Sequence, residues 1–491
     1  MTFKTSIRRG RIILATLMAT SSLAVLSACA VGPDFQWPLP PVSQHYDRQA
    51  EQDLATAGRL SGAQRIDARR QIDGNWWSAF RSVKLDGVMR AAIAGNLDLA
   101  AADAMISQAH EATVAAGGKL QPQVDVGAVG GRQRIDGGTR AVTTRFYSVG
   151  ALASFDFDLF GGTHRLVEQR AAIAEVQQHR FDAAYLTLTG NVASQALLLA
   201  SARAQIDAVQ RLLADDRRNL DLVSTGHRYG SATQVDVALA ANQLAQDQTL
   251  LPPLAQQRDV ARHALSVLAG KGPADWTPPD FDLSDFVLPL DLPVSLPSEL
   301  ARNRPDILAA EAQLHAASAA IGVATADLYP HLQLTGSLGA AASGPGVGAL
   351  WSIAAGLVGP VFHGGTLEAN RRAAVDAYRA SVASYRKTVV GSLGQVADIL
   401  QAVSHDAEEY AAQERAIGAA EASLHLSREG YRAGEINALQ FLDAERGYQR
   451  ALLGQIRART AQYLDTVQLS VALGGNTSGA FARSADVAAV K

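Results

Sequence analysis

Few residues in this sequence have spacings that would support chemistry. The chain contains no HExxH, CxxC, phosphate-binding glycine loop or nucleophile elbow. Asp156 and Asp158 are two residues apart, so on a strand their carboxylates would share a face, either as a catalytic pair or as part of a solvated polar wall. The wall is the better interpretation. His164 and His363 flank glycine bends and are expected at a membrane interface, and the 11 histidines show no metal-ligand spacing. We therefore expect neither an enzyme nor a metal site.

The only cysteine, Cys29, does have an informative position. It follows a basic start and a short apolar segment over 12–26, which is the pattern of an export signal. The stretch 26–29 resembles a bacterial lipoprotein box, in which the cysteine is lipidated and becomes the first residue. We therefore expect removal of residues 1–28, a covalent lipid on Cys29 and no other cofactor. Ala30, in place of an aspartate, favours the outer membrane. The alternative is an ordinary signal peptide with an incidental cysteine.

Composition limits the class of protein. The 491 residues include 44 Lys+Arg and 47 Asp+Glu, a net charge of -3, so no basic face for nucleic acid is expected. A single cysteine excludes an intramolecular disulfide. Aromatic residues make up only 6% of the chain, and alanine is abundant. This composition favours long, closely packed helices over a compact aromatic core.

The 17 prolines leave two long proline-free intervals, 123–251 and 361–491, each able to hold a very long helix. A helix over 163–225 would extend roughly 95 Å. Its length argues against the alternative, a single amphipathic surface helix. Small and apolar residues recur along it at a spacing typical of a coiled-coil seam. They are Val192, Leu199, Ala202, Ile206, Val209 and Leu213.

Short motifs recur in the same order in the two halves of the chain. The segments 96–98 and 120–122 have counterparts about 208 residues later, at 304–306 and 328–330. Further along, the same kind of match occurs at an offset of about 204 residues. There Gly230 with Thr233 corresponds to Gly434 with Asn437. The sequence is therefore a duplicated unit of about 200 residues.

Each repeat contains two stretches in which apolar and polar residues alternate. The expected strands are about 123–134, 145–159, 331–341 and 350–362. Their length suits tilted membrane strands. The interval 328–367 lacks charged side chains, which hydropathy alone would interpret as a membrane helix. Pro345, Pro360 and many glycines interrupt it, so a hairpin fits better. A buried soluble hairpin is the alternative.

Four membrane strands cannot close a barrel, and an open sheet edge is not tolerated in lipid. The chain is therefore expected to form an oligomer. Two chains would give eight strands and a lumen filled with side chains, whereas three would give 12 strands and room for a passage.

The ordered motifs resemble the TolC-like outer-membrane factor family of tripartite efflux systems, in particular its lipoprotein branch of the OprM/NodT type. The likeness covers nearly the whole mature chain. It is carried by Cys29 with 31–35, Trp76-Trp77, 96–98, 159–161, 304–306, 329–330, 431–434 and 473–475. One departure is Asn476 after the final glycine pair. The resemblance implies a mainly α-helical chain with a membrane β-barrel portion, built on a duplicated strand–strand–long-helix unit. A homotrimer would share a 12-strand outer-membrane barrel and a 12-helix periplasmic tunnel.

On this resemblance the chain divides into a signal peptide, two repeats and connecting segments. The two long helices are expected at about 163–228 and 366–430, and Pro252-Pro253 should break a shorter helix. The segments are 1–28 signal peptide, 29–80 lipidated N-terminal segment with equatorial contacts, 81–271 first repeat, 272–296 equatorial linker, 297–472 second repeat and 473–491 C-terminal tail.

Two glycines are expected to end the long helices at reversing turns. Gly230 and Gly434 permit the left-handed backbone of a helix end, and Thr233 and Asn437 are suitable N-caps for the returning helices. In the family that the chain resembles, these turns contact the adaptor and close the tunnel.

The resemblance also suggests a periplasmic gate. It implies a hydrogen bond between Tyr431 and Asp236, and pore-facing positions at Gln440 and Asp443, where Gln440 replaces an acid. Ile436 replaces an arginine that helps to lock some family members. Three Asp443 carboxylates near one axis would repel one another and attract cations. The alternative is that Asp236 and Asp443 only stabilise the starts of their helices.

The function implied is a passive outer-membrane exit duct that conducts small molecules such as drugs. The chain would be lipid-anchored in the outer membrane and extend into the periplasm. Its partners would be outer-membrane lipid, a periplasmic adaptor and an inner-membrane RND-type pump. The alternative is a lipid-anchored periplasmic coiled-coil scaffold or adaptor.

Overall fold

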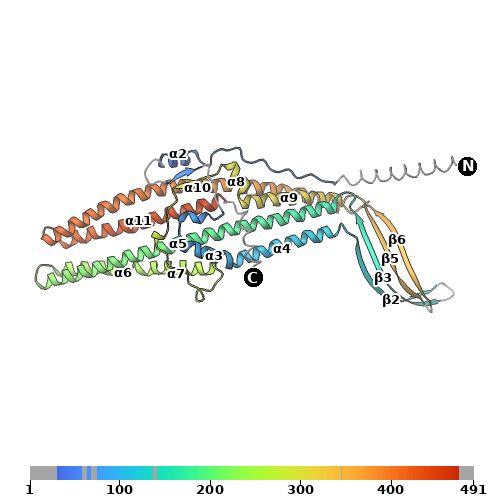
Figure 1. Ribbon diagram of the computed structural model, residues 1–491, viewed down its shortest axis with the longest axis horizontal. Coiled ribbons are helices and arrows are strands. Elements are labelled where there is room, and N and C mark those ends of the chain that lie inside the picture. The colour runs from blue at the N-terminus through green and yellow to red at the C-terminus, as the bar shows by residue number, and fades with distance from the viewer. Residues whose placement is uncertain (1–29, 58–63, 68–73, 137–140, 344–345, 475–491) are drawn as a thin grey trace. The chain divides into compact units, whose positions relative to one another are not determined.

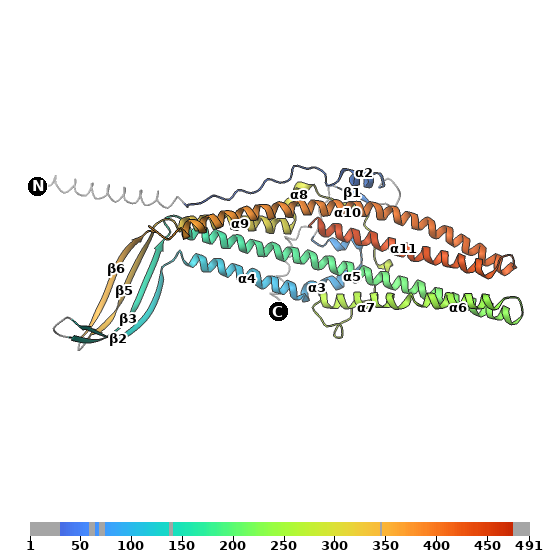
Figure 2. The same cartoon turned by 180° about the vertical axis from the view of Figure 1, so that it is seen from behind.

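A computed structural model describes residues 30–57, 64–67, 74–136, 141–343 and 346–474 of the chain (Figures 1 and 2). The expected signal peptide, the lipid site at Cys29 and the tail from 475 onward lie outside these residues. The chain forms two compact units. The strand unit comprises Met1–Leu39, Ala104–His179 and Ala309–Lys387, and the helical unit comprises Pro40–Asp103, Arg180–Leu308 and Thr388–Lys491. Because each unit takes segments from both repeats, the repeats are not separate domains.

The strand unit contains one antiparallel sheet of four strands in the order β2-β3-β5-β6 (Figure 1). The strands are β2 (Gln123–Asp136), β3 (Ala141–Phe157), β5 (His331–Ser343) and β6 (Gly346–Val358). The interval that hydropathy alone would interpret as a membrane helix is thus the β5–β6 hairpin. The last strand ends four residues before its expected end at 362. Gly359 and Pro360 follow it directly, and proline has no N–H for a ladder.

The central pair of strands joins the two repeats. β3 pairs with β5 from Phe146↔Ser343 to Phe157↔Leu332, so the outer pairs are local hairpins and the inner pair is formed by distant segments.

The two long helices are α5 (Gly162–Arg228, 67 residues) and α10 (Thr366–Ala433, 68 residues). At the start of α5 the Asp158 carboxylate accepts hydrogen bonds from the N–H groups of Thr163 (3.0 Å) and His164 (2.8 Å). Asp158 therefore lies past the end of β3. The expectation that it shares a strand face with Asp156 is wrong, because the first N–H groups of a helix need acceptors and Asp158 supplies them.

Shorter helices precede the strands in each repeat. They are α3 (Val83–Gly95) and α4 (Leu97–Gly118) in the first and α8 (Pro297–Asn303) and α9 (Pro305–Ala326) in the second. Among the described residues, α9 is the one helix long and apolar enough to cross a membrane. Part of it is buried, including Ile307, Leu314 and Ala319.

The returning helices differ between the repeats. The first repeat has α6 (Gln234–Gln248) and α7 (Leu251–Leu268), whereas the second has the continuous α11 (Ala438–Ala472). Pro252 and Pro253 lie in the first turn of α7, where a missing N–H breaks no hydrogen bond. The expected break at this proline pair is therefore present.

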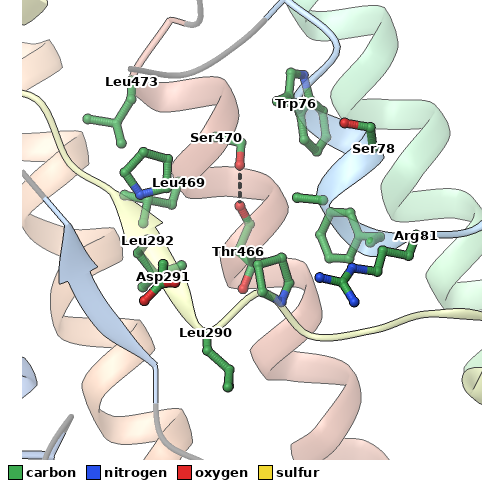
Figure 3. Close-up of a pocket in the computed structure, with 14 residues that line it drawn as sticks. Trp76, Ser78, Arg81, Leu290, Asp291, Leu292, Thr466, Leu469, Ser470 and Leu473 are labelled. Atoms are coloured by element: carbon green, nitrogen blue, oxygen red, sulfur yellow. Dashed lines mark hydrogen bonds between the residues drawn. The ribbon is translucent and has the colours of Figure 1, made fainter. Parts of the chain in front are cut away.

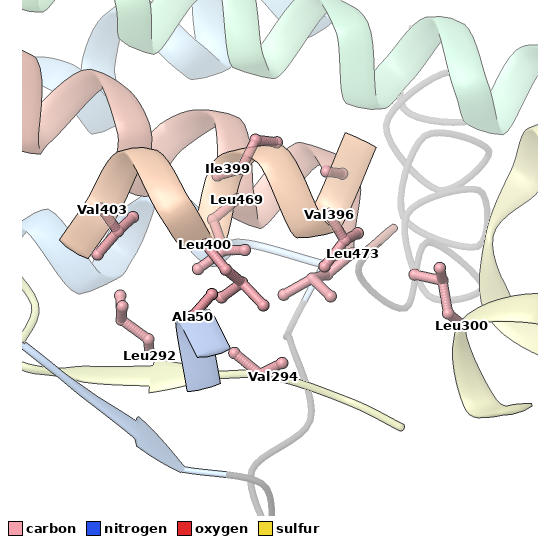
Figure 4. Close-up of a cluster of buried hydrophobic side chains, with 11 residues drawn as sticks. Ala50, Leu292, Val294, Leu300, Val396, Ile399, Leu400, Val403, Leu469 and Leu473 are labelled. Carbon is pink, nitrogen blue, oxygen red and sulfur yellow. The ribbon is translucent and has the colours of Figure 1, made fainter. Parts of the chain in front are cut away.

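The core of the helical unit contains the six expected seam residues of α5, all of which are buried. A second cluster joins α2 (Arg48–Ala57), β4 (Asp291–Pro293), α8, α10 and α11 (Figure 4). Its buried members are Ala50, Leu292, Val294, Leu300, Val396, Ile399, Leu400, Val403, Leu469, Ala472 and Leu473. β4 also pairs in parallel with β1 (Arg65–Asp67). Segments from 30–80 and 272–296 thus pack against the long helices.

Candidate functional site

The chain reverses at two turns of the helical unit, one between α5 and α6 and one between α10 and α11. Gly230 and Gly434 have φ values of +79° and +78°, a conformation that glycine adopts without strain. In both turns the glycine N–H donates to the carbonyl three residues earlier (3.0 and 3.1 Å). The next N–H donates to the carbonyl five residues earlier (2.8 Å in each). This hydrogen-bond pair satisfies helix-terminal carbonyls, so both turns close in the same way.

The two returning helices also begin in the same way, with reciprocal caps. Asp236 N–H donates to Thr233 Oγ1 (3.2 Å), and Thr233 N–H donates to the Asp236 carboxylate (2.8 Å). At the second turn, Gln440 N–H donates to Asn437 Oδ1 (3.0 Å), and Asn437 N–H donates to Gln440 Oε1 (3.2 Å). Each pair satisfies two N–H groups that a helix start leaves without partners.

Tyr431 and Asp236 lie near each other in the structure, but each makes its contacts with a different residue. The Tyr431 ring stacks on Phe441, with centroids 5.5 Å apart. Burial raises the pKa of its phenol, and the charge of Asp236 raises it further. Among the described residues, the hydrogen-bond partner of the Asp236 carboxylate is Thr233, through both its N–H and its hydroxyl (2.8 Å each). Those bonds hold the pKa of Asp236 below its ordinary value. In the single chain, Asp236 therefore caps its helix.

The other two candidate gate residues lie at the start of α11. Gln440 and Asp443 are both exposed, and a spacing of three residues puts them on one face of the helix. Gln440 supplies the cap described above, so it has a structural role in the single chain.

Sequence inspection missed a buried acidic cluster where three helices meet. Asp216 of α5 and Glu445 of α11 are only 2% and 4% exposed. Burial raises the pKa of Asp216 to about 8, with a further contribution from Asp247 of α6. Burial likewise raises the pKa of Glu445 to about 7. Asn219 Nδ2 donates to Glu445 Oε2 at 2.6 Å. The only sequence signal is an acidic residue among apolar heptad positions.

One face of the sheet is apolar and exposed. Residues paired across the strands share a face, so the register assigns most of the apolar positions of the four strands to one side. Its exposed members include Val124, Val126, Tyr147, Val149, Leu338, Trp351, Ile353 and Leu357. The other face is more polar, and the Ser337 and Ser352 hydroxyls form a 2.8 Å hydrogen bond there. An exposed apolar face of this extent marks a membrane or protein contact.

The first described residues form an N-terminal strap (residues 30–37) on the strand unit. Val31 N–H donates to Phe160 O (3.0 Å), just beyond β3. Arg165 Nη2 donates to Asp34 Oδ1 (2.6 Å). Phe35 stacks on His315, with centroids 4.4 Å apart. The residues next to Cys29 are thus held at the helix-proximal end of the sheet. These contacts depend on distant segments, and no local pattern indicates them.

A pocket of about 300 Å³ lies in the helical unit beside η1 (Trp76–Phe80), β4 and α11 (Figure 3). Trp76, Phe80 and Leu292 supply much of its apolar wall. The one acid that lines it, Asp291, forms an ion pair with Arg65 at 2.5 Å. The lining contains no base and nucleophile pair. Within the described ranges, no group of three or more His, Cys, Asp or Glu side chains is arranged to hold a metal.

These features define a class of protein. An exposed apolar sheet, continuous with very long helices that reverse at paired glycine turns, is the architecture of a TolC-like outer-membrane channel subunit. Residues 88–271 and 296–475 match the family described as outer membrane efflux protein, and the chain belongs to this family.

Individual relatives agree with this assignment over most of the chain. The chain is 31% identical over 421 residues to the pyoverdine export outer membrane protein OpmQ of Pseudomonas putida, which covers 82% of this chain and 88% of the relative. It is 30% identical over 474 residues to OpmQ of Pseudomonas aeruginosa, covering 93% and 97%. The solved structure of the outer-membrane channel OprN has a TM-score of 0.83 at 27% identity and covers 91% of this chain and 99% of that chain. The protein is therefore an outer-membrane efflux component.

Proposed function

We propose that three copies of this chain close one 12-strand outer-membrane barrel and continue it as a helical tunnel. The supporting observation is that β2 and β6, at the two sides of the sheet, each pair with one other described strand, beside an exposed apolar face. Lipid does not tolerate unpaired backbone groups. Three such sheets make a barrel wide enough for a passage, whereas two make one filled by side chains.

The test is the mass and conductance of the purified mature protein. We expect a three-chain mass in detergent and discrete channels in planar bilayers. A monomer that forms no pores would contradict the proposal. Cys29→Ala supplies the control for anchoring: a barrel stays in the membrane after alkaline extraction, whereas a lipid-anchored scaffold or adaptor is released once its lipid is lost.

The duct would be the outer part of a tripartite machine with a periplasmic adaptor and an inner-membrane RND-type pump. The chain has no nucleotide-binding motif, so energy for export has to come from a partner. Relatives of similar length are named for the export of pyoverdine, cations or toluene. This variety on one fold supports a duct that passes small molecules, such as drugs, chosen by its pump. Pairing the chain with two different pump–adaptor sets should change the exported substrate. A fixed substrate would contradict this.

The lipid on Cys29 would enter the membrane next to the barrel. The N-terminal strap supports this, because Val31 is bonded at the end of β3 and two residues span only about 7 Å. Mass spectrometry of the mature N-terminus should find acyl chains on Cys29, and Cys29→Ser should lack them. An unmodified thiol in the wild type would contradict the assignment.

Tyr431, Asp236, Asp443 and Gln440 would line the periplasmic gate of the trimer. Tyr431→Phe combined with Asp236→Ala should raise single-channel conductance. Asp236→Asn sharpens the test, since its side-chain oxygen preserves the cap while the charge is lost. Unchanged conductance in the double variant would leave both residues with packing and capping roles only. The tip turns at Gly230, Thr233, Gly434 and Asn437 would contact the adaptor, which cross-linking from neighbouring exposed positions would test.

A further inference from the structure

The β2–β3 hairpin extends beyond the rest of the sheet. The β3–β5 pairing ends at Phe146, but the β2–β3 pairing continues to Asp136. The extension is a two-stranded ribbon at the end of the sheet opposite the helices, because β2 follows α4 and β3 leads into α5.

Three arginines lie on this ribbon, on the same face as the apolar membrane residues. Arg132 is directly opposite Arg145, and Arg134 follows two residues later. Because side chains alternate between the two faces of a strand, these arginines lie on the same face as Val126 and Tyr147. All three arginines are exposed.

The charges on this face are unbalanced. Within the described part of the chain, neither Arg132 nor Arg145 has an ion-pair partner. Arg132 and Arg145 are cross-strand partners on this face, so two like charges stand directly opposite each other. Like charges directly opposite each other destabilise a sheet, and an anion bound between Arg132 and Arg145 would relieve this repulsion.

A shallow apolar hollow of about 370 Å³ lies next to the arginines on the sheet. Small residues of β2 and β5 and larger residues of β3 line it. Its lining includes Ala128, Gly130, Tyr147, Val149, Ala340 and Ala342. Tyr147 is two residues from Arg145, or about 7 Å along the strand. The pair Arg132 and Arg145 therefore lies one alternation step along the strands from the apolar hollow.

We propose that this arginine site binds a phosphate-bearing lipid of the outer leaflet, with a phosphate on Arg132 and Arg145 and an acyl chain in the hollow. Guanidinium groups match phosphate geometry with paired hydrogen bonds. Apolar chains alone would fit the hollow equally well without the arginines, so the combination selects an anionic lipid. The inference rests on the proposed function, since it requires the hairpin ends to face the cell exterior.

The test is the affinity of the purified full-length protein in detergent for fluorescent lipopolysaccharide, whose lipid carries phosphates. Each arginine near a membrane surface contributes about fivefold in affinity. R132Q/R145Q should therefore weaken binding roughly 10- to 30-fold. Inorganic phosphate should compete only weakly, because it cannot fill the hollow, and binding of diacylglycerol, which has acyl chains but no phosphate, should not respond to the substitutions. Strong competition by inorganic phosphate would overturn the lipid assignment.

A matched control moves the charges to the other face. Gln133 and Thr144 are the adjacent cross-strand pair, so R132Q/R145Q/Q133R/T144R keeps the net charge but turns it toward the opposite side. It should not restore binding. Ala340→Phe should weaken binding with the arginines intact, by filling the hollow.

Unchanged affinity in R132Q/R145Q, or full restoration in the four-residue variant, would overturn the inference. Conductance of the same preparations separates this outcome from failure of the proposed function. Normal channels with arginine-independent binding reject only the lipid site, whereas a wild type without channels rejects the duct itself.

Discussion

The two tip turns have the same backbone but different chemistry. Gly230 and Gly434 have nearly identical φ values and the same closing hydrogen bonds, and each is followed by a reciprocal cap. The residue that completes the cap is Asp236 in the first turn and Gln440 in the second. After duplication, the geometry of the turn has therefore been retained while its charge has diverged.

The neighbouring helices show the same divergence. Asp216 and Asp247 line the buried acidic cluster, whereas alanines stand about 204 residues later, at Ala420 and Ala451. The acidic contact between the two hairpins therefore has no duplicate, and four predictions test how far the equivalence of the repeats extends.

The largest effect is expected from Glu445→Gln. The raised pKa of Glu445, about 7, means that the folded protein holds a proton that the unfolded chain releases above its ordinary carboxyl pKa. Stability therefore falls as pH rises toward 7. The amide of the variant would keep an oxygen acceptor for Asn219 and would carry no buried charge. At pH 8 we expect roughly 2–3 kcal/mol of added stability, measured by denaturant unfolding. An equal gain at pH 4 would contradict the explanation.

The next effect should be equal at the two tips. Gly230→Ala and Gly434→Ala each force an alanine into the left-handed region, at about 1–2 kcal/mol. An added Cβ would meet no atom within 4 Å at either site, so only the backbone contributes. Hydrogen exchange at the turns should accelerate roughly 5- to 30-fold. Gly447→Ala, in the interior of α11 with the same open surroundings, is the control and should not accelerate exchange. Clearly unequal effects would break the equivalence of the turns.

Removing the caps should have a smaller effect. Thr233→Ala and Asn437→Ala each leave helix-start N–H groups without a partner and should cost about 1 kcal/mol. Exchange of the first-turn amides of α6 or α11 measures this directly. Thr233→Ser keeps the hydroxyl and serves as the control. If Thr233→Ser is as damaging as Thr233→Ala, the cap is not the cause.

The smallest effect should distinguish the tips by pH. The pKa of Asp236 is lowered by the hydrogen bonds from Thr233. Its contribution is present above its ordinary pKa and is lost as pH falls through the lowered value. Exchange at the first tip should therefore accelerate in acid, and Asp236→Asn should abolish that response. The second tip, with Gln440, should show no comparable acceleration in acid. An equal acceleration there would mean that Asp236 is not its cause.

Local patterns were sufficient to predict much of this fold. The long helices follow from proline-free intervals, the strands from alternation and the tip turns from glycine followed by a capping residue. Each of these depends on a few neighbouring residues. By contrast, predicting that the chain is a channel of this class required the order of motifs over the whole chain.

Features that depend on distant contacts were not predictable in the same way. Asp158 continues the strand alternation, yet the N–H groups of the next helix bind it more favourably than a strand position would. The partners of Glu445 come from three helices, and the strap contacts of Phe35 and Arg165 join segments over 130 residues apart. No local window contains these pairings.

The pairing of β3 with β5 also sets an order of events during synthesis. β3 is complete about 186 residues before β5, which at 5–20 residues per second is roughly 10–40 s. Throughout that interval both strands of the β2–β3 hairpin have been made, but the inner edge of β3 has no native partner. An apolar hairpin with a free edge readily pairs with other chains. The duplicated architecture thus creates a period of vulnerability to aggregation, during which a holding chaperone would protect the nascent protein.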